Sequence, residues 1–86
     1  MPPRVITLVT KPDCHLCDTA RDVVAQVVAE LADGASAPSV DVREFSILDD
    51  AALAEEYAEE VPVVLIDGRV HTVWRVDPAR LRAALR

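Results

Sequence analysis

Residues 4–10 are mostly β-branched and apolar, and this short run stops at Pro12. From Leu16 onward the apolar spacing changes from that of a strand to that of a helix. The apolar positions are Leu16, Ala20, Val23, Val24, Val27, Val28 and Leu31. Their separations of 4, 3, 1, 3, 1 and 3 residues place them on one helix face. Gly34 is a residue type that commonly follows the last turn of a helix. The chain therefore begins with a buried strand followed by a long amphipathic helix.

The rest of the chain continues this alternation of strand and helix. We expect a loop at 35–39, a strand containing Val40, Val42 and Phe45, a helix at 51–59, a strand at 61–66, a return strand at 69–76 and a last helix from Pro78. Asp67-Gly68 is a hairpin signal between the last two strands. The first strand–helix–strand unit should be parallel, with a right-handed crossover. The order β-α-β-α-β-β-α predicts an α/β fold, with a four-stranded mixed sheet covered by helices on both faces.

Length and composition exclude several classes of protein. Eighty-six residues are enough for a single domain, 1–86. The 51% of hydrophobic residues is too high for a disordered chain, yet no apolar run reaches the length of a membrane span. Nine basic against 15 acidic residues give a net charge of −6, which argues against binding to a nucleic-acid backbone. The N-terminus lacks the features of a signal peptide, so we expect a cytoplasmic domain.

The two cysteines form the constellation with the clearest chemistry, Cys14-His15-Leu16-Cys17. Cys14 should lie at the helix N-terminus, where free backbone N–H groups and the helix dipole favour a thiolate. Cys17 follows one turn later, so the two sulfurs can approach each other. Such a pair can reduce a disulfide by thiol–disulfide exchange. Lys11 is close enough in sequence to help the thiolate or attract an anionic substrate, and His15 could shuttle protons.

Other interpretations of the cysteines remain open at this point. A zinc site needs four ligands, and only His15 and His71 could add to the pair, so we expect no metal. A purely structural disulfide is poorly preserved in a reducing compartment. Pro62, at the start of the third strand, could be cis and leave the Val61 backbone free to pair with an extended substrate, or trans and merely end the preceding helix.

The chain resembles the glutaredoxins of the thioredoxin superfamily. The matching residues are Lys11-Pro12-x-Cys14-x-x-Cys17, Val61-Pro62-Val63-Val64 and Asp67-Gly68, and the likeness runs from Val5 to Leu85. The small bacterial glutaredoxin-like proteins are the most similar. The resemblance implies a thioredoxin-like fold, Cys14 as the nucleophile, Cys17 as the resolving thiol, a cis Pro62 and a Lys11 that contacts the glutathione carboxylate.

Two departures from the glutaredoxin pattern keep the function open. His15-Leu16 stands where glutaredoxins have Pro-Tyr, and Arg75–Pro78 lacks their Gly-Gly turn. We expect a thiol-disulfide oxidoreductase for protein or low-molecular-weight mixed disulfides, with no bound cofactor and with glutathione or another small thiol as reductant. The alternative is a thioredoxin-fold binding or redox-sensing module. We expect as partners a disulfide-bearing protein or small thiol as substrate, and a reductase or low-molecular-weight thiol. We expect no nucleic acid and no membrane, and we expect the protein itself to be a monomer.

Two further features of the sequence bear on function. Trp74 alternates in phase with Val70, Thr72 and Val76, which favours core packing over a substrate platform. Residues 49–60 carry six acids and no base. We interpret them as a solvated helix face, with a docking patch for a basic partner as the alternative.

Overall fold

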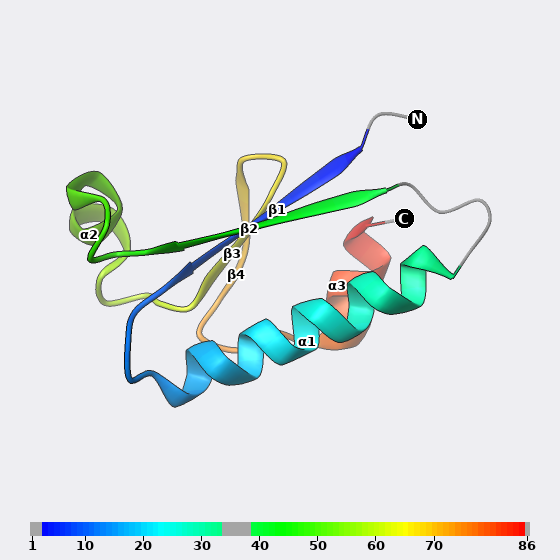
Figure 1. Ribbon diagram of the computed structural model, residues 1–86, viewed down its shortest axis with the longest axis horizontal. Coiled ribbons are helices and arrows are strands. Elements are labelled where there is room, and N and C mark those ends of the chain that lie inside the picture. Colours follow the sequence, from blue (N-terminus) through cyan, green and yellow to red (C-terminus); the bar gives the residue numbers. More distant parts are fainter. Residues whose placement is uncertain (1–2, 34–38, 86) are drawn as a thin grey trace.

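The computed structural model describes residues 3–33 and 39–85 (Figure 1). The elements are β1 (Arg4–Thr10), α1 (His15–Ala32), β2 (Val40–Ser46), α2 (Ala51–Tyr57), β3 (Val63–Ile66), β4 (Arg69–Val73) and α3 (Pro78–Leu85). The predicted element order is confirmed. The expected helix stop at Gly34 and most of the expected loop at 35–39 lie outside the described residues.

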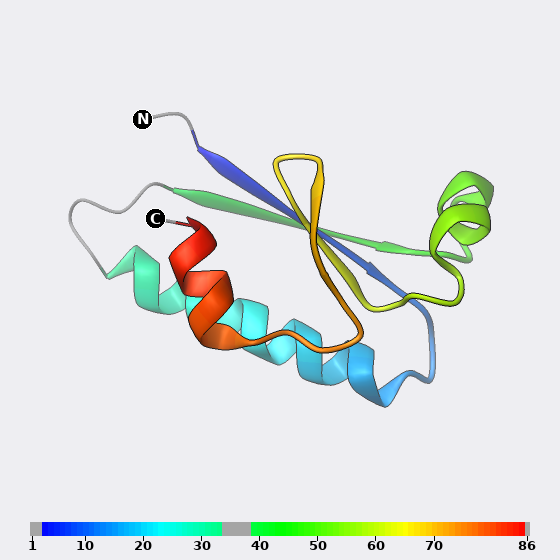
Figure 2. The same cartoon turned by 180° about the vertical axis from the view of Figure 1, so that it is seen from behind.

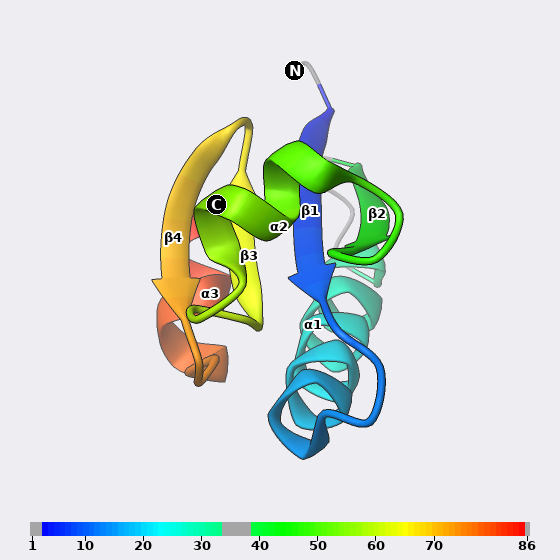
Figure 3. The ribbon, with the colours of Figure 1, turned by 90° about the vertical axis from the view of Figure 1, so that its left-hand side faces the viewer.

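The four strands form one mixed sheet in the order β2-β1-β3-β4. β1 pairs parallel with β2, whereas the β1–β3 and β3–β4 pairs are antiparallel. Figure 3 shows α2 in front of the sheet and α1 with α3 behind it. The thioredoxin-like α/β architecture expected from the sequence is therefore the observed one.

The larger part of the core lies between the sheet and the α1–α3 layer. Ile6 and Leu8 of β1 and Val64 of β3 face this layer, and all three are at most 1% exposed. The buried side chains of α1 are Cys17, Ala20, Val24, Val27 and Leu31, which fall on the apolar stripe found in the sequence. Figure 2 shows α3 beside α1, and Arg82 of α3 pairs with Glu30 of α1 at 2.8 Å. The helical stripe thus fixes which face of α1 is buried.

The β3–β4 hairpin turns at Asp67-Gly68, as the dipeptide predicts. Both residues have positive φ, 51° and 85°, which is the backbone shape of a tight hairpin turn. The Asp67 carboxylate also accepts hydrogen bonds from the Val5 backbone N–H at 2.9 Å and from Arg4 Nε at 2.7 Å. These contacts, led by the backbone hydrogen bond, lower the pKa of Asp67. The turn is therefore joined to the start of β1.

Several expected boundaries were too long. β4 ends at Val73 instead of reaching residue 76, α2 ends at Tyr57 and β3 starts at Val63. The β3–β4 register shifts at Val64/Leu65, so simple alternation does not hold along β4. Within the described ranges, no helix is both long and apolar enough to cross a bilayer.

Candidate active site

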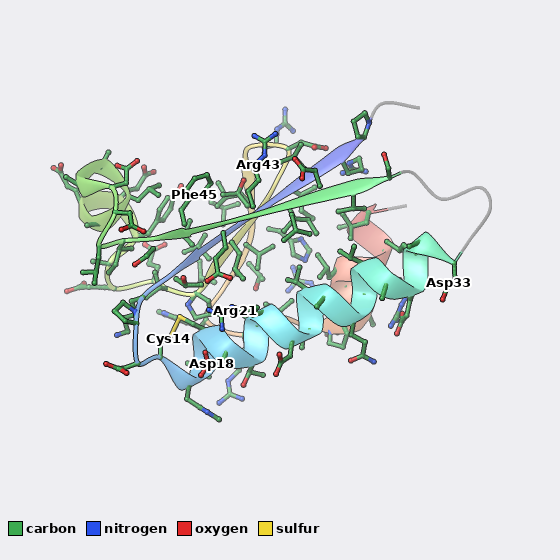
Figure 4. The ribbon with its side chains drawn as sticks, viewed as in Figure 1. Cys14, Asp18, Arg21, Asp33, Arg43 and Phe45 are labelled. Carbon is green, nitrogen blue, oxygen red and sulfur yellow. A yellow bond between two sulfur atoms is a disulfide. The ribbon has the colours of Figure 1, made fainter. Side chains whose placement is uncertain are left out.

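The junction between β1 and α1 places Cys14 at the start of the helix (Figure 4). Asp13 has a φ of 56°, a left-handed conformation that Asp tolerates better than most residues. Cys14 is the N-cap residue of α1, with extended backbone angles. Its Sγ accepts a hydrogen bond from the Cys17 backbone N–H at 3.1 Å. One N–H group of the first turn therefore points toward this sulfur, which lies at the helix start as the sequence predicted.

Cys14 and Cys17 are joined by a disulfide in this structure, with their Cα atoms 5.2 Å apart. The two side chains differ in access to solvent, because Cys14 is 9% exposed and Cys17 only 1%. An incoming disulfide can reach Cys14 more readily than Cys17. The asymmetry fits an attacking and a resolving thiol.

The loop before β3 lies against the cysteine pair. Val61 packs in the same buried cluster as Cys14 and Cys17, and Pro62 is fully buried. The Val61–Pro62 peptide bond is cis. The structure thus brings two predicted site segments, about 45 residues apart in sequence, into one cluster.

The remaining predicted site residues lie on the rim of this cluster. Lys11 follows the last residue of β1, and His15 is the first residue of α1. Both side chains are exposed. Neither residue belongs to the buried cluster.

A cavity of about 370 Å³ opens beside the cysteine motif. His15 and Leu16 line one side, and the segment 74–76 after β4 lines the other. Trp74 is 54% exposed, so the expectation that it packs in the core was wrong. β4 ends one residue before it, and its φ of 64° takes the chain out of the strand. The sequence held no signal for this departure, because a strand over 69–76 is compatible with a helix that starts at Pro78.

Two hydrogen bonds hold Trp74 against the loop that carries Pro62. The Trp74 backbone N–H donates to the Pro62 carbonyl at 2.8 Å. The indole Nε1–H donates to the Glu59 carbonyl at 3.2 Å. Trp74 therefore connects the end of the α2 region to the cysteine cluster, a role that its place in the sequence does not reveal.

A polar network joins β1, β2 and α1 close to the cysteines. Thr10, the last residue of β1, donates its hydroxyl to Glu44 at 3.2 Å. Arg21 donates to Glu44 through two guanidinium nitrogens, each at 2.8 Å, and to Asp18 at 2.9 Å. Figure 4 shows Arg21 and Asp18 on the first turns of α1. The hydrogen bonds from Arg21 lower the pKa of Glu44. The network ties the N-terminal part of α1 to the sheet.

The acidic segment ahead of the site is only lightly packed. No residue of α2 is buried, and Asp50 caps this helix by accepting from the Ala52 and Leu53 backbone N–H groups. Desolvation, followed by the charges of Glu56 and Glu60, raises the pKa of Tyr57. Among the described residues, no three His, Cys, Asp or Glu side chains gather into a group that could hold a metal ion.

Comparison with known proteins places this geometry in a family. Residues 5–86 match the family model "Glutaredoxin-like domain (DUF836)". A Mycobacterium tuberculosis protein, "Uncharacterized protein Rv0508", is 35% identical over 78 residues, which are 91% of this chain and 78% of that protein. The crystal structure of the Xanthomonas target XcR50 ("X. campestris") is 40% identical, covers 93% of both chains and superposes with a TM-score of 0.68.

A more distant neighbour supports the fold alone. Oxidised mitochondrial thioredoxin 3 from Saccharomyces cerevisiae is 12% identical, with a TM-score of 0.66 over 99% of this chain and 78% of that one. The family model matches nearly the whole sequence, and the XcR50 structure matches nearly the whole fold. The chain belongs to the glutaredoxin-like domain family.

Proposed function

We propose that this protein is a dithiol–disulfide oxidoreductase that reduces mixed disulfides of proteins or of low-molecular-weight thiols. The observation that carries the proposal is the Cys14 sulfur at the N-cap of α1, where it accepts the Cys17 N–H. Hydrogen bonds and the helix dipole stabilise negative charge on such a sulfur, and the thiolate is the reactive form of cysteine.

The first step is attack by the Cys14 thiolate on one sulfur of the substrate disulfide. A bond forms between Cys14 Sγ and that sulfur while the substrate S–S bond breaks. The other substrate sulfur leaves as a thiolate and takes a proton from solvent. The product is a mixed disulfide on the more exposed of the two cysteines.

The second step uses Cys17, which is buried and one helical turn away. Its thiol loses a proton, and the sulfur attacks Cys14 Sγ. The intramolecular disulfide forms, the mixed disulfide breaks and the second substrate thiolate leaves and is protonated. The substrate gains two electrons, and the protein ends with the Cys14–Cys17 disulfide that this structure contains.

A second reaction must return the protein to its dithiol form. Glutathione, another small thiol or a reductase could supply the two electrons. A cytoplasmic location fits this need, because that compartment keeps thiols reduced. Lys11 and His15, exposed beside Cys14, would bind the substrate or its anionic groups, and the Val61–Pro62 loop would contact its extended backbone.

A single-turnover experiment tests the roles of the two cysteines without assuming a reductant. The reduced protein is mixed with a peptide–glutathione mixed disulfide, and thiol release is followed over time. Cys14→Ser should release no thiol above the uncatalysed background, because it lacks the nucleophile. Cys17→Ser should accumulate a mixed disulfide on Cys14, visible as an added mass, because it lacks the resolving thiol.

Leu48→Ala provides the matched control, because Leu48 is 74% exposed and lies outside the cysteine cluster. It should release thiol at the wild-type rate. Full activity of Cys14→Ser would overturn the proposal. A wild-type protein that binds the peptide but releases no thiol would instead support the binding-module alternative.

A further inference from the structure

β2 forms one edge of the sheet and has a neighbour, β1, on one side (Figure 3). None of its seven residues is buried, and Val42 is 42% exposed. An edge strand presents unpaired N–H and C=O groups that can pair with another strand. What this strand can pair with depends on which of its groups point outward and on the charges beside them.

The hydrogen bonds to β1 show which groups point outward. The Arg4 N–H donates to the Ser39 carbonyl, and the Ile47 N–H donates to the Thr10 carbonyl, each at 2.9 Å. With Arg4 opposite Val40 and Thr10 opposite Ser46, odd-numbered residues of β2 therefore direct their backbone groups toward β1. Even-numbered residues direct theirs to the free edge, since backbone direction alternates along a strand. The outward residues are Val40, Val42, Glu44 and Ser46.

The charges beside these groups are self-complementary. Asp41 and Arg43 flank Val42, have side chains that are 54% and 58% exposed, and pair with each other at 3.0 Å. In an antiparallel pair of β2 strands centred on Val42, Asp41 of each copy lies opposite Arg43 of the other. Both are then in non-hydrogen-bonded positions, where opposite side chains come closest. Charged side chains usually prevent an edge strand from pairing with another strand. Here the acid of one copy meets the base of the other, so the charges favour the pairing.

Other antiparallel registers are less favourable. A shift of the pairing by one residue sets outward backbone groups of one strand against inward groups of the other, so no ladder forms. Centring on Asp41 or Arg43 pairs outward groups but places two like charges opposite each other. Centring on Glu44 places two glutamates opposite each other, which is destabilising. Centring on Val40 moves half of the ladder onto residues outside β2. The register centred on Val42 alone pairs outward backbone groups and opposite charges together.

An apolar groove runs along this edge on the α1 side. It has a volume of about 350 Å³, and most of its lining is apolar, from Val42, Leu8 and small side chains of α1 such as Ala25. The Arg21–Glu44 ion pair also lines it. Pairing would bring Val42 of each copy together and cover part of this groove.

We propose that the protein forms a symmetric homodimer through antiparallel pairing of β2 with β2, centred on Val42. The two sheets become one of eight strands. The pairing places the two cysteine motifs at opposite ends of the joined sheet, because β1 and β2 run in the same direction. The sequence alone favoured a monomer, since it does not reveal which strand lies at an edge.

Sedimentation equilibrium over a concentration series, with reductant present to exclude intermolecular disulfides, tests the proposal. The wild type should approach twice the 9.4 kDa of the single chain. Arg43→Asp should shift the protein toward monomer, because it opposes Asp41 to an acid. Arg69→Asp, the same charge change at the β4 end of the sheet, is the matched control and should dimerise like the wild type.

Exchanging the two charges gives a test that restores the dimer instead of only disrupting it. Asp41→Arg and Arg43→Asp should each be monomeric, because each carries two like charges at the interface. Mixed together, they should form a heterodimer in which every facing pair is opposite in charge. Val42→Pro should abolish dimers, because it removes an outward N–H and leaves the bonds to β1 intact.

A wild type that stays monomeric up to its solubility limit would overturn the proposal. So would a dimer that persists in both Arg43→Asp and Val42→Pro, or a mixture of the two charge variants that stays monomeric. The cysteine chemistry does not enter these outcomes, so they are independent of the proposed function.

Discussion

At the residue scale, the two cysteines differ through their surroundings. Both belong to one buried cluster with Val9, Val61 and Val63, but Cys14 caps the helix and is 9% exposed, whereas Cys17 is 1% exposed. A three-residue separation in a helix suffices to produce this difference. The function that we propose assigns substrate attack to Cys14 and disulfide closure to Cys17.

The same contrast between buried and exposed positions determines the cost of a substitution. Leu81 of α3 is fully buried in the larger core, whereas Leu48 is 74% exposed. Leu81→Ala should lower the free energy of unfolding by about 2–5 kcal/mol, through lost transfer energy and a residual cavity. Leu48→Ala should change it by less than about 0.5 kcal/mol. Urea denaturation measures both, and equal effects would contradict the assigned core.

At the element scale, the hairpin and the segment after it shape the site. β4 ends at Val73, and Trp74 then bonds back to the Pro62 carbonyl and the Glu59 carbonyl. Segment 74–76 thereby faces the start of α1 across the cavity. A longer β4, as the alternating pattern suggested, would have carried Trp74 away from this position.

At Gly68 in the hairpin turn, the effect of backbone conformation on stability can be measured without a steric clash. Gly68 has a φ of 85°, and a Cβ built on it would meet nothing within 4 Å. Gly68→Ala should therefore lose about 1 kcal/mol of stability from backbone conformation alone. Gly68→Asn should lose less, because Asn adopts the left-handed region more readily. Thermal or urea unfolding compares the two, and an Asn variant less stable than the Ala variant would contradict the argument.

At the scale of the whole molecule, an 86-residue chain divides its core into two buried clusters on opposite faces of the sheet. The larger one lies under α1 and α3, and the smaller one contains the cysteines. Polar networks fasten the layers at their edges, and the Arg21–Glu44–Thr10 group joins three elements beside the cysteine cluster. A domain of this size buries a small fraction of its surface and is marginally stable, so we expect these polar contacts to contribute to its stability.

The lowered pKa of Glu44 predicts how this network responds to acid. At low pH the unfolded state binds a proton at Glu44 more readily than the folded state does. The stabilisation by Glu44 is therefore present above the ordinary glutamate pKa of about 4.3 and is lost as the pH falls through the folded value. Glu44→Gln should have a lower free energy of unfolding than the wild type at neutral pH. The difference between the two should become smaller in acid.

Urea denaturation at several pH values measures this narrowing. Glu55→Gln removes an exposed carboxylate of α2 that forms no ion pair within residues 3–33 and 39–85. The difference in free energy of unfolding between Glu55→Gln and the wild type should not narrow in this way as the pH falls. A Glu44→Gln gap that stays constant from neutral to acidic pH would contradict the role given to the network.

Sequence by itself determined the order of the elements, the buried face of α1 and the position of Cys14 at a helix start. These follow from local periodicity and from residue types at strand and helix ends. Tertiary structure decided that β2 is an edge strand, that Val61 contacts the cysteines and that Trp74 is exposed beside them. These depend on strand pairing between distant segments and on one register shift. Local side-chain patterns do not encode which strands become neighbours, because that choice rests on the packing of the whole sheet.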